Sequence, residues 1–367
     1  MKRESARSVQ ILKTLKEEIL TGRYVKAQTF PSEVALSRRF DVSRSMMTFV
    51  VSELEKQGLV TRSQGRPTLV TKRGANRKIG LILPGVAVSD FFRPMVTELF
   101  RLARENGYEL DFSEVWSSSH DERVAQVREL AASLIGKKVA GVIYEPLAGE
   151  GSVEINDEIL SMFDRSGIPV VLIDSDILPF PDLGRYDFIG VDDLSAGACI
   201  ARHLVSAGAK RIHFLQPLET TLIYQKRIVG ARTYLREFSR NCKTETLTAA
   251  PADFAALTRH LKRFGRPDAF VCPNDAIAAV FLKTLGKARL KVPQDVLVTG
   301  FADLLVASLT TPTLTTVRQP IKDVGRVAFL RLLDRIADPA LPVCSIALHA
   351  KLVVRESTVR TRVGRNG

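Results

Sequence analysis

The chain has 367 residues, of which 45% are hydrophobic and 25% are charged, and its formal net charge is +13. This length exceeds what a single hydrophobic core usually supports, so we expect at least two domains. The longest apolar runs, such as residues 79–84, have the length of a strand and not of a membrane span, and the first ten residues are polar and basic, unlike an export signal. We therefore expect a cytoplasmic protein with no membrane association.

The cysteines are widely scattered, and no cysteine or histidine lies at the spacing of a metal site or a disulfide framework. We expect four buried thiols in a reducing compartment, with no metal and no cofactor. These cysteines are Cys199, Cys242, Cys272 and Cys344.

The positive charge is concentrated near the start of the chain. Residues 1–78 contain 17 Lys and Arg but only 7 Asp and Glu, a net charge of +10, which leaves +3 for residues 79–367. A small domain with this charge density attracts a polyanion through counterion release, and DNA is the commonest such partner. The alternative is a solvated basic face that only keeps the protein soluble.

Three helices and a hairpin are predicted in this basic segment, which we call the head, residues 1–71. Residues 9–20 carry apolar side chains at helical spacing and end at Thr21 and Gly22. Ser32 can cap a short second helix that ends at Phe40, and Ser43 can cap a third that ends before Gly58. Two short strands at residues 59–62 and 68–71 flank a turn-rich segment at residues 63–67, which predicts a hairpin.

This pattern favours DNA binding, with the start of the third helix in the major groove and the hairpin at the backbone or the minor groove. We also place Arg39 at a phosphate. Each arginine taken alone could instead be a solvated surface charge. The predicted DNA-contacting residues are Ser32, Arg38, Ser43, Arg44, Ser45, Thr48, Arg62, Gln64, Gly65 and Arg66.

Residues 22–70 resemble the GntR-type winged helix. The resemblance rests on Gly22, the triplet PSE at residues 31–33, VSR at 42–44, GLV at 58–60 and the hairpin residues 65–70. The resemblance implies arginine where Thr48 stands and a second hairpin glycine where Pro67 stands, so the base preference of this chain is expected to differ from that of typical members.

After a charged linker at residues 72–78, the chain alternates strand-like and helical segments up to residue 367. Such alternation predicts an α/β fold with parallel sheets covered by helices. The predicted strands are residues 79–84, 108–112, 139–145, 168–174, 211–215, 269–273 and 296–301, and the predicted helices are residues 92–106, 121–135, 195–207, 225–238 and 275–285.

Polar residues follow several of these strands, where parallel sheets bind their ligands. Carboxylates and amides at these positions suit a polar, hydroxyl-rich small molecule. The alternative is that they cap helices and form turns, and we assign Asp192 and Asp193 to that role. The predicted effector-binding residues are Asp90, Phe91, Glu145, Asp174, Arg227, Asn274, Asp275 and Asp303.

Residues 79–358 resemble the LacI-type sensor, which shares its fold with periplasmic sugar-binding proteins. The matching segments include SDFF at residues 89–92, GIPVVLIDSD at 167–176, RIVGARTYL at 227–235 and PTLTTVRQP at 312–320. The resemblance implies two lobes joined by three crossovers, near residues 189–192, 302–320 and 341–348. It also places Asp90, Phe91, Asp174, Arg227 and Asn274 at effector contacts, whereas Ala302 stands where many members have an acid.

The two resemblances together imply the organisation of arabinose-repressor-like regulators. We therefore predict a ligand-responsive transcription regulator, a repressor that binds operator DNA as a homodimer and senses a sugar or related molecule between its lobes. A solute-binding protein of a sugar transporter is the alternative, although the basic head and the absent export signal argue against it. An enzyme is disfavoured because neither a metal-spaced histidine pair nor a glycine-rich phosphate loop is found.

Overall fold

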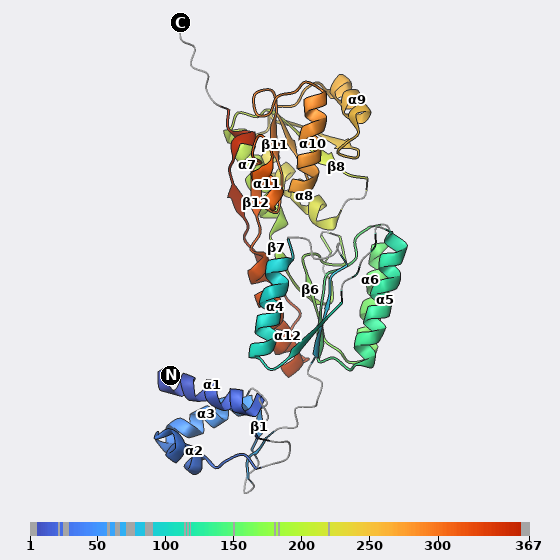
Figure 1. Ribbon diagram of the computed structural model, residues 1–367. Coiled ribbons are helices and arrows are strands. Elements are labelled where there is room, and N and C mark those ends of the chain that lie inside the picture. Colours follow the sequence, from blue (N-terminus) through green and yellow to red (C-terminus); the bar gives the residue numbers. More distant parts are fainter. Residues whose placement is uncertain are drawn as a thin grey trace. The chain divides into compact units, whose positions relative to one another are not determined.

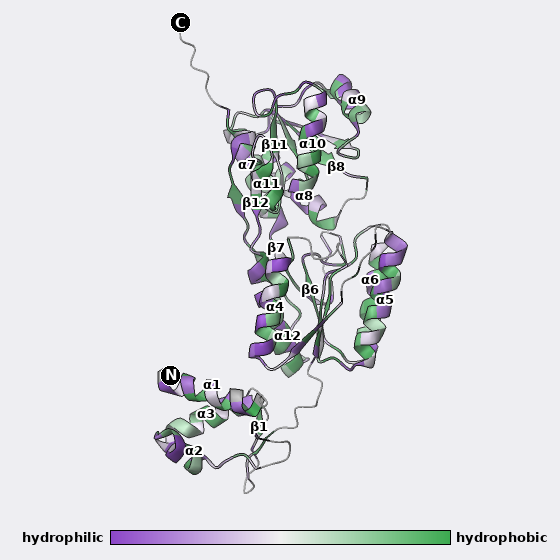
Figure 2. Cartoon of the chain, in the orientation of Figure 1, coloured by the Kyte–Doolittle hydropathy of each residue, from purple (hydrophilic) through white to green (hydrophobic). Residues whose placement is uncertain are grey.

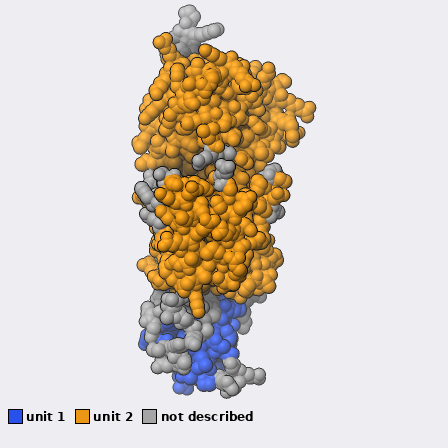
Figure 3. All heavy atoms as spheres, turned by 90° about the vertical axis from the view of Figure 1, so that its right-hand side faces the viewer, with its two compact units in different colours: residues 1–77 blue, residues 78–367 orange. Residues whose placement is uncertain are grey.

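The chain divides into two compact units, residues 1–77 and residues 78–367 (Figure 3). No described helix is both long and apolar enough to cross a membrane. The computed structural model describes residues 6–20, 23–24, 29–56, 59–62, 67–70, 78–84, 91–113, 115, 117, 119–149, 151–179, 181–182, 184–218 and 221–360.

The first unit is the predicted helix-turn-helix with its hairpin. Leu15, Leu36, Met47 and Leu54 are buried in one small core, so each helix contributes its apolar face. The elements are α1 (Ala6–Leu20), α2 (Glu33–Phe40), α3 (Arg44–Lys56), β1 (Val60–Thr61) and β2 (Leu69–Val70), and β1 and β2 pair antiparallel. Residues 71–77, most of the predicted linker, lie outside the described residues, and Lys78, predicted as its last residue, is instead the first residue of β3.

The second unit has two lobes, and the first is built on a six-stranded parallel sheet of order β13-β7-β6-β5-β3-β4. Helices α4 and α12 cover one face, and α5 and α6 cover the other (Figure 1). The strands are β3 (Lys78–Ile82), β4 (Glu109–Phe112), β5 (Gly141–Tyr144), β6 (Val170–Ile173), β7 (Asp187–Val191) and β13 (Ser345–Leu348), and the helices are α4 (Arg93–Glu105), α5 (His120–Gly136), α6 (Ser152–Arg165) and α12 (Ile321–Ala337).

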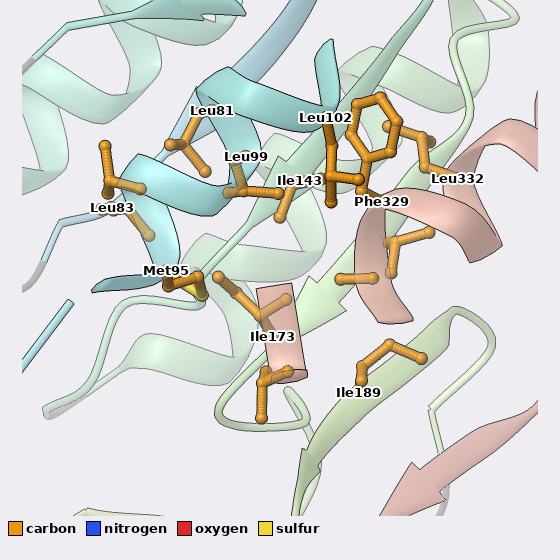
Figure 4. Close-up of a cluster of buried hydrophobic side chains, with 14 of the residues drawn as sticks. Leu81, Leu83, Met95, Leu99, Leu102, Ile143, Ile173, Ile189, Phe329 and Leu332 are labelled. Carbon is orange, nitrogen blue, oxygen red and sulfur yellow. The ribbon is translucent and has the colours of Figure 1, made fainter. Parts of the chain in front are cut away.

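The central strands of this sheet are buried on both faces, which is why they read as continuous apolar runs. On one face, Leu81, Ile143 and Ile173 pack against Leu99 of α4 and Phe329 of α12 (Figure 4). The helices are amphipathic by contrast, with apolar and polar stripes along α4 and α5 (Figure 2).

The second lobe has a four-stranded parallel sheet of order β11-β10-β8-β9. Helices α7 and α8 pack on one face, and α9 and α10 pack on the other. Its elements are α7 (Asp193–Ser206), β8 (Arg211–Gln216), α8 (Leu222–Phe238), β9 (Lys243–Thr248), α9 (Phe254–Phe264), β10 (Ala269–Val271), α10 (Asp275–Lys287), β11 (Leu297–Thr299), α11 (Leu305–Leu309), β12 (Thr316–Arg318), β14 (Lys351–Val353) and η1 (Glu356–Thr358).

The chain passes between the lobes three times. The first crossover leads from β7 into α7, the second from β12 into α12, and the third from β13 into β14. The third passage, at residues 349–350, lies just beyond the predicted range of 341–348. Because β12 and β14 pair antiparallel, the second and third crossovers run side by side.

Candidate effector cleft and DNA-binding face

A cavity of about 430 Å³ lies between the two lobes, within the size range of small-molecule sites. It receives side chains from both lobes and from the second crossover. Its lining includes Phe91, Asp174, Thr221, Tyr224, Arg227, Asn274, Phe301, Ala302 and Gln319.

The position of Arg227 in this cavity follows from two glycines. A Cβ on Gly197 of α7 would lie 1.9 Å from the backbone oxygen of Arg227, and a Cβ on Gly230 of α8 would lie 2.0 Å from the backbone oxygen of Leu194. No side chain fits at either position, so α7 and α8 can approach until their backbones touch. This approach places Arg227 beside the first turn of α7, where Asp193 lies.

The guanidinium of Arg227 is held by three contacts. Its Nε donates to Asp193 Oδ1 at 2.7 Å, and its Nη1 donates to the backbone oxygen of Pro273 at 3.1 Å. Its central carbon lies 3.4 Å from the centroid of the Phe301 ring, a cation–π contact. Burial raises the pKa of Asp193, and the charge of Arg227 opposes that rise. The arginine is thus oriented and paired before any ligand enters.

Asp174 follows β6 and faces the same cavity. Its φ is +64°, a left-handed conformation that aspartate tolerates better than most residues. No side-chain hydrogen bond joins its carboxylate to another described residue. Burial and the neighbouring Asp193 raise the pKa of Asp174 to about 6, and Arg227 opposes the shift. This carboxylate is therefore available to accept hydrogen bonds from a ligand.

Asn274 and Gln319 add two amides to the lining. Asn274 caps α10, and its Oδ1 accepts from the backbone N–H of Ile277 at 2.8 Å, which leaves its Nδ2 to donate into the cavity. The Oε1 of Gln319 is buried and lacks a hydrogen-bond partner within the part of the chain that the structure describes. A buried acceptor without a partner is costly, so a ligand hydroxyl that donated to it would be stabilised.

A second chamber of about 260 Å³ adjoins the first, and both are lined by Asp174, Thr221 and Ile223. Glu145 and the segment after it form one wall. This segment is fixed by Asn156 of α6, whose Oδ1 accepts from Tyr144 Oη at 2.5 Å and from the backbone N–H of Leu147 at 2.9 Å. The buried amide of Asn156 therefore holds the segment that follows β5.

Two of the predicted effector residues do not line either chamber. Asp275 is fully buried, and its Oδ2 accepts from the backbone N–H of Leu304 at 2.7 Å. Asp303 binds Arg318 at 2.6 Å and Arg355 at 2.7 Å, and these ion pairs hold the pKa of Asp303 below its usual range in spite of its burial. The structure thus uses both carboxylates within the second lobe and its crossovers, and the predicted Asp90 lies outside the described residues.

In the head, the start of α3 presents Arg44, Ser45 and Thr48 to solvent, and α2 presents Arg38. Neither Arg38 nor Arg44 has an ionic partner among the described residues. The hydroxyl of Thr48 donates to Glu33 Oε2 at 2.6 Å. Two of the three predicted serines lie at the beginnings of these helices: Ser32 Oγ accepts from Ala35 N at 3.2 Å, and Ser43 Oγ accepts from Met46 N at 3.3 Å.

Arg62 and Arg39, unlike Arg38 and Arg44, have carboxylate partners within the head. Arg62 binds Glu55 through Nε at 2.7 Å and Glu33 through Nη1 at 3.2 Å, while Arg39 pairs with Glu18 of α1. Both guanidinium groups are therefore paired with carboxylates inside the head, although each side chain keeps about one third of its surface exposed, and their contact with DNA stays a prediction. The predicted hairpin contacts Gln64, Gly65 and Arg66 lie outside the described residues.

Comparison with known proteins matches each unit separately. Residues 7–70 match the bacterial regulatory proteins of the gntR family, and residues 201–358 match the periplasmic binding protein-like domain. The arabinose metabolism transcriptional repressor of Geobacillus stearothermophilus is 27% identical over 364 residues, which cover 94% of this chain and 96% of that protein.

Two further relatives are transcription regulators that match more than half of this chain. The HTH-type transcriptional regulator MalR of Streptomyces coelicolor is 31% identical over 245 residues, 63% of this chain and 67% of that protein. The crystal structure of the transcription regulator GntR from Chromobacterium violaceum has a TM-score of 0.59 and 26% identity, and the match covers 77% of this chain and 99% of that one. The chain therefore belongs to the bacterial HTH-type transcription regulators in which a GntR-type DNA-binding head is joined to a LacI-type sensor.

Proposed function

We propose that this regulator is a sugar-responsive repressor whose effector binds in the cavity between the lobes. The observation that carries the proposal is the convergence of Asp174, Arg227, Asn274 and Gln319 on one cavity. Carboxylate, guanidinium and amide groups together supply the acceptors and donors that sugar hydroxyls need. A relative that matches the chain over nearly its whole length is named for arabinose metabolism, which supports a sugar as the effector.

In the head, we propose that Arg44, Ser45 and Thr48 read base edges in the major groove and that Arg38 binds a phosphate. Support comes from their exposure on α2 and α3 and from the basic charge of this segment. Ser32 and Ser43 lie at the starts of α2 and α3, where backbone N–H groups favour phosphates.

The effect of effector binding then has to be transmitted from the sensor to the head. The cavity is lined by Phe91 and Asp174 of the first lobe and by Arg227 and Asn274 of the second, so a ligand that contacts both lobes favours their closed arrangement. We propose that this closure changes the spacing of two heads in a homodimer, and a coupling of about 1–3 kcal/mol would suffice for a useful switch. The exposed side chains of Phe100, Leu305 and Leu309 are apolar candidates for the contact between the two copies.

The proposed function is tested by operator binding. Fluorescence anisotropy with DNA from the promoter region of the gene itself should show a dimer that binds with nanomolar affinity and dissociates when a sugar is added. We further propose that the protein is cytoplasmic and acts by binding alone, without turnover. An operator affinity that no sensor-bound sugar alters, or chemical conversion of the sugar by the purified protein, would contradict this assignment.

A further inference from the structure

We propose that the effector carries no negatively charged group, so that the regulator reads a free polyhydroxyl compound and rejects its phosphate esters and its carboxylic acids. The inference rests on the proposed function of the cleft as the effector site. It adds the charge class of the ligand, which neither the fold nor the shape of the cavity determines.

The described lining of the two chambers offers no available cation. Arg227 is the one Lys, Arg or His among the described residues that line the two chambers. Its guanidinium is paired with Asp193 at 2.7 Å, and both side chains are less than one tenth exposed. A phosphate or carboxylate that entered would have to compete with a buried carboxylate already in place, and arginine and lysine are the side chains that normally recognise such anions.

The remaining charged residues of the described lining are acidic. Asp174 lies between the two chambers, and Glu145, Glu154 and Asp176 line the second chamber. Asp176 is occupied by the backbone N–H groups of Ile177 and Gly184, at 2.7 and 3.2 Å, but it still contributes negative potential. Like charges placed together in a desolvated site cost several kcal/mol, so this lining repels an anionic ligand.

The sequence extends this argument to the sensor residues that the structure does not describe. Between residues 78 and 360, none of these is Lys, Arg or His, and four are acidic: Asp90, Glu114, Glu150 and Glu219. Wherever these residues lie, they cannot supply the missing cation.

Hydrogen-bond chemistry points the same way. The carboxylate of Asp174 and the Oε1 of Gln319, which has no partner among the described residues, are acceptors, so the ligand must donate to them. Hydroxyl and ammonium groups can donate, whereas a carboxylate or a fully ionised phosphate placed at these two acceptors could only accept. The regulator would consequently respond to a sugar before a kinase adds phosphate to it or a dehydrogenase oxidises it to an acid.

The test uses the full chain and three matched sets of ligands. Neutral sugars (L-arabinose, D-ribose, D-galactose, cellobiose) are compared with their phosphate esters and with their aldonic or uronic acids, and amino sugars form a cationic set. The readout is the shift in melting temperature, followed by Kd from calorimetry. We expect stabilisation by a neutral or cationic sugar and binding about 100-fold weaker for its anionic counterpart.

The possible outcomes separate this inference from the proposed function. A phosphate ester or sugar acid that binds as tightly as its neutral parent, or more tightly, would overturn the inference and leave the sensor function standing. Stabilisation by no member of any set would contradict the sensor function together with the inference.

A variant assigns the discrimination to a residue. Asp174→Asn removes one acid from the junction of the chambers, and the ratio of the Kd of the phosphate ester to that of the neutral sugar should fall about tenfold. Glu129→Gln removes an exposed acid of α5 that lines neither chamber, and it should leave the ratio unchanged. An equal ratio in wild type and Asp174→Asn would show that Asp174 does not contribute to charge selection.

Discussion

The head and the cleft use the same side chain in opposite ways. Arg38 and Arg44 of the head are exposed and have no carboxylate partner among the described residues, so their charge is available to a polyanion. Arg227 of the cleft is buried against Asp193 and the Phe301 ring, so its charge is already neutralised. The difference shows that the function of an arginine depends on whether the fold supplies its counter-ion.

The head itself repeats the contrast. Arg39 and Arg62 are also basic residues near the DNA-binding helices. Arg39 pairs with Glu18, however, and Arg62 pairs with both Glu33 and Glu55. Sequence position therefore does not distinguish an arginine whose charge is paired within the head from one whose charge is not. Substitution of the carboxylate partner, or of the arginine itself, distinguishes the two kinds of arginine.

The largest effect should follow from removing the partner of the buried arginine. Asp193→Ala leaves the charge of Arg227 uncompensated, and we expect a loss of about 3–5 kcal/mol in the free energy of unfolding, measured by urea denaturation of the full chain. The control is Asp192→Ala, because Asp192 caps α7 by accepting from Ser195 N at 3.0 Å. It should cost only about 1 kcal/mol. Equal losses in the two variants would mean that the buried pair contributes nothing beyond a cap.

A smaller loss of unfolding free energy is expected when α7 and α8, which carry Asp193 and Arg227, are forced apart. The Cβ of Gly230→Ala would overlap the Leu194 backbone, which cannot move as a side chain can, so we expect a loss of about 2–3 kcal/mol. Gly286→Ala in α10 meets no atom within 4 Å and should instead stabilise the sensor by about 0.5–1 kcal/mol. Denaturation curves of both variants, with effector affinity measured beside them, would check this. Tolerance of Gly230→Ala would show that α7 and α8 need not touch.

Removal of an arginine that has no ionic partner among the described residues should affect DNA binding and leave stability unchanged. Arg44→Ala is expected to weaken operator binding about 10- to 100-fold, and Arg38→Ala is expected to lower the slope of log affinity against log salt by about one. Anisotropy titrations at several salt concentrations would measure both effects. Arg240→Ala, which removes an exposed arginine of the sensor, is the control. If it weakened DNA binding as much, the head would not be the DNA-binding surface.

The smallest effect concerns pH. Asp174 loses its charge as the pH falls through about 6, and a protonated carboxyl is a weaker acceptor than a carboxylate. Affinity for a neutral sugar should therefore be full above pH 7 and decline about fivefold by pH 5. Calorimetry across this range would measure the decline, and Asp174→Asn should abolish it. An identical decline in that variant would assign the titration to another group, such as the buried Asp275, whose pKa burial also raises to about 6.

Much of the fold could be predicted because its signals are local. Apolar runs of strand length lie at the centres of both sheets, and glycine and cap residues mark the helices of the head. Some elements were not predicted although their signal was present. In α6 and α12, for example, buried side chains recur at helical spacing, and they include Phe163 and Phe329. The strand β9 had a weaker signal, since KTETLT is polar and lies at the edge of its sheet.

The cleft was only partly predictable. Asp174 and Asn274 share one cavity because the ends of parallel strands meet there, and Phe91 and Arg227 also line it, the latter from inside α8. The role of Asp193 was missed, since two adjacent aspartates before a helix both suggest caps, and only the approach of α7 to α8 distinguishes them. Gln319 was missed as well, because nothing local indicates that a crossover residue faces the cavity.

The ion pairs of Asp303 have a consequence for how the lobes can move. This carboxylate clamps Arg318, the last residue of β12, and Arg355, which follows β14, so both crossover strands are fixed to the second lobe up to those points. We expect the bending to concentrate in the short stretches that remain, residues 319–320 and 349–350. Gln319 lies in the first of these stretches and also lines the cavity, so we expect a hydroxyl bound to its amide to act at a point where the chain bends between the lobes.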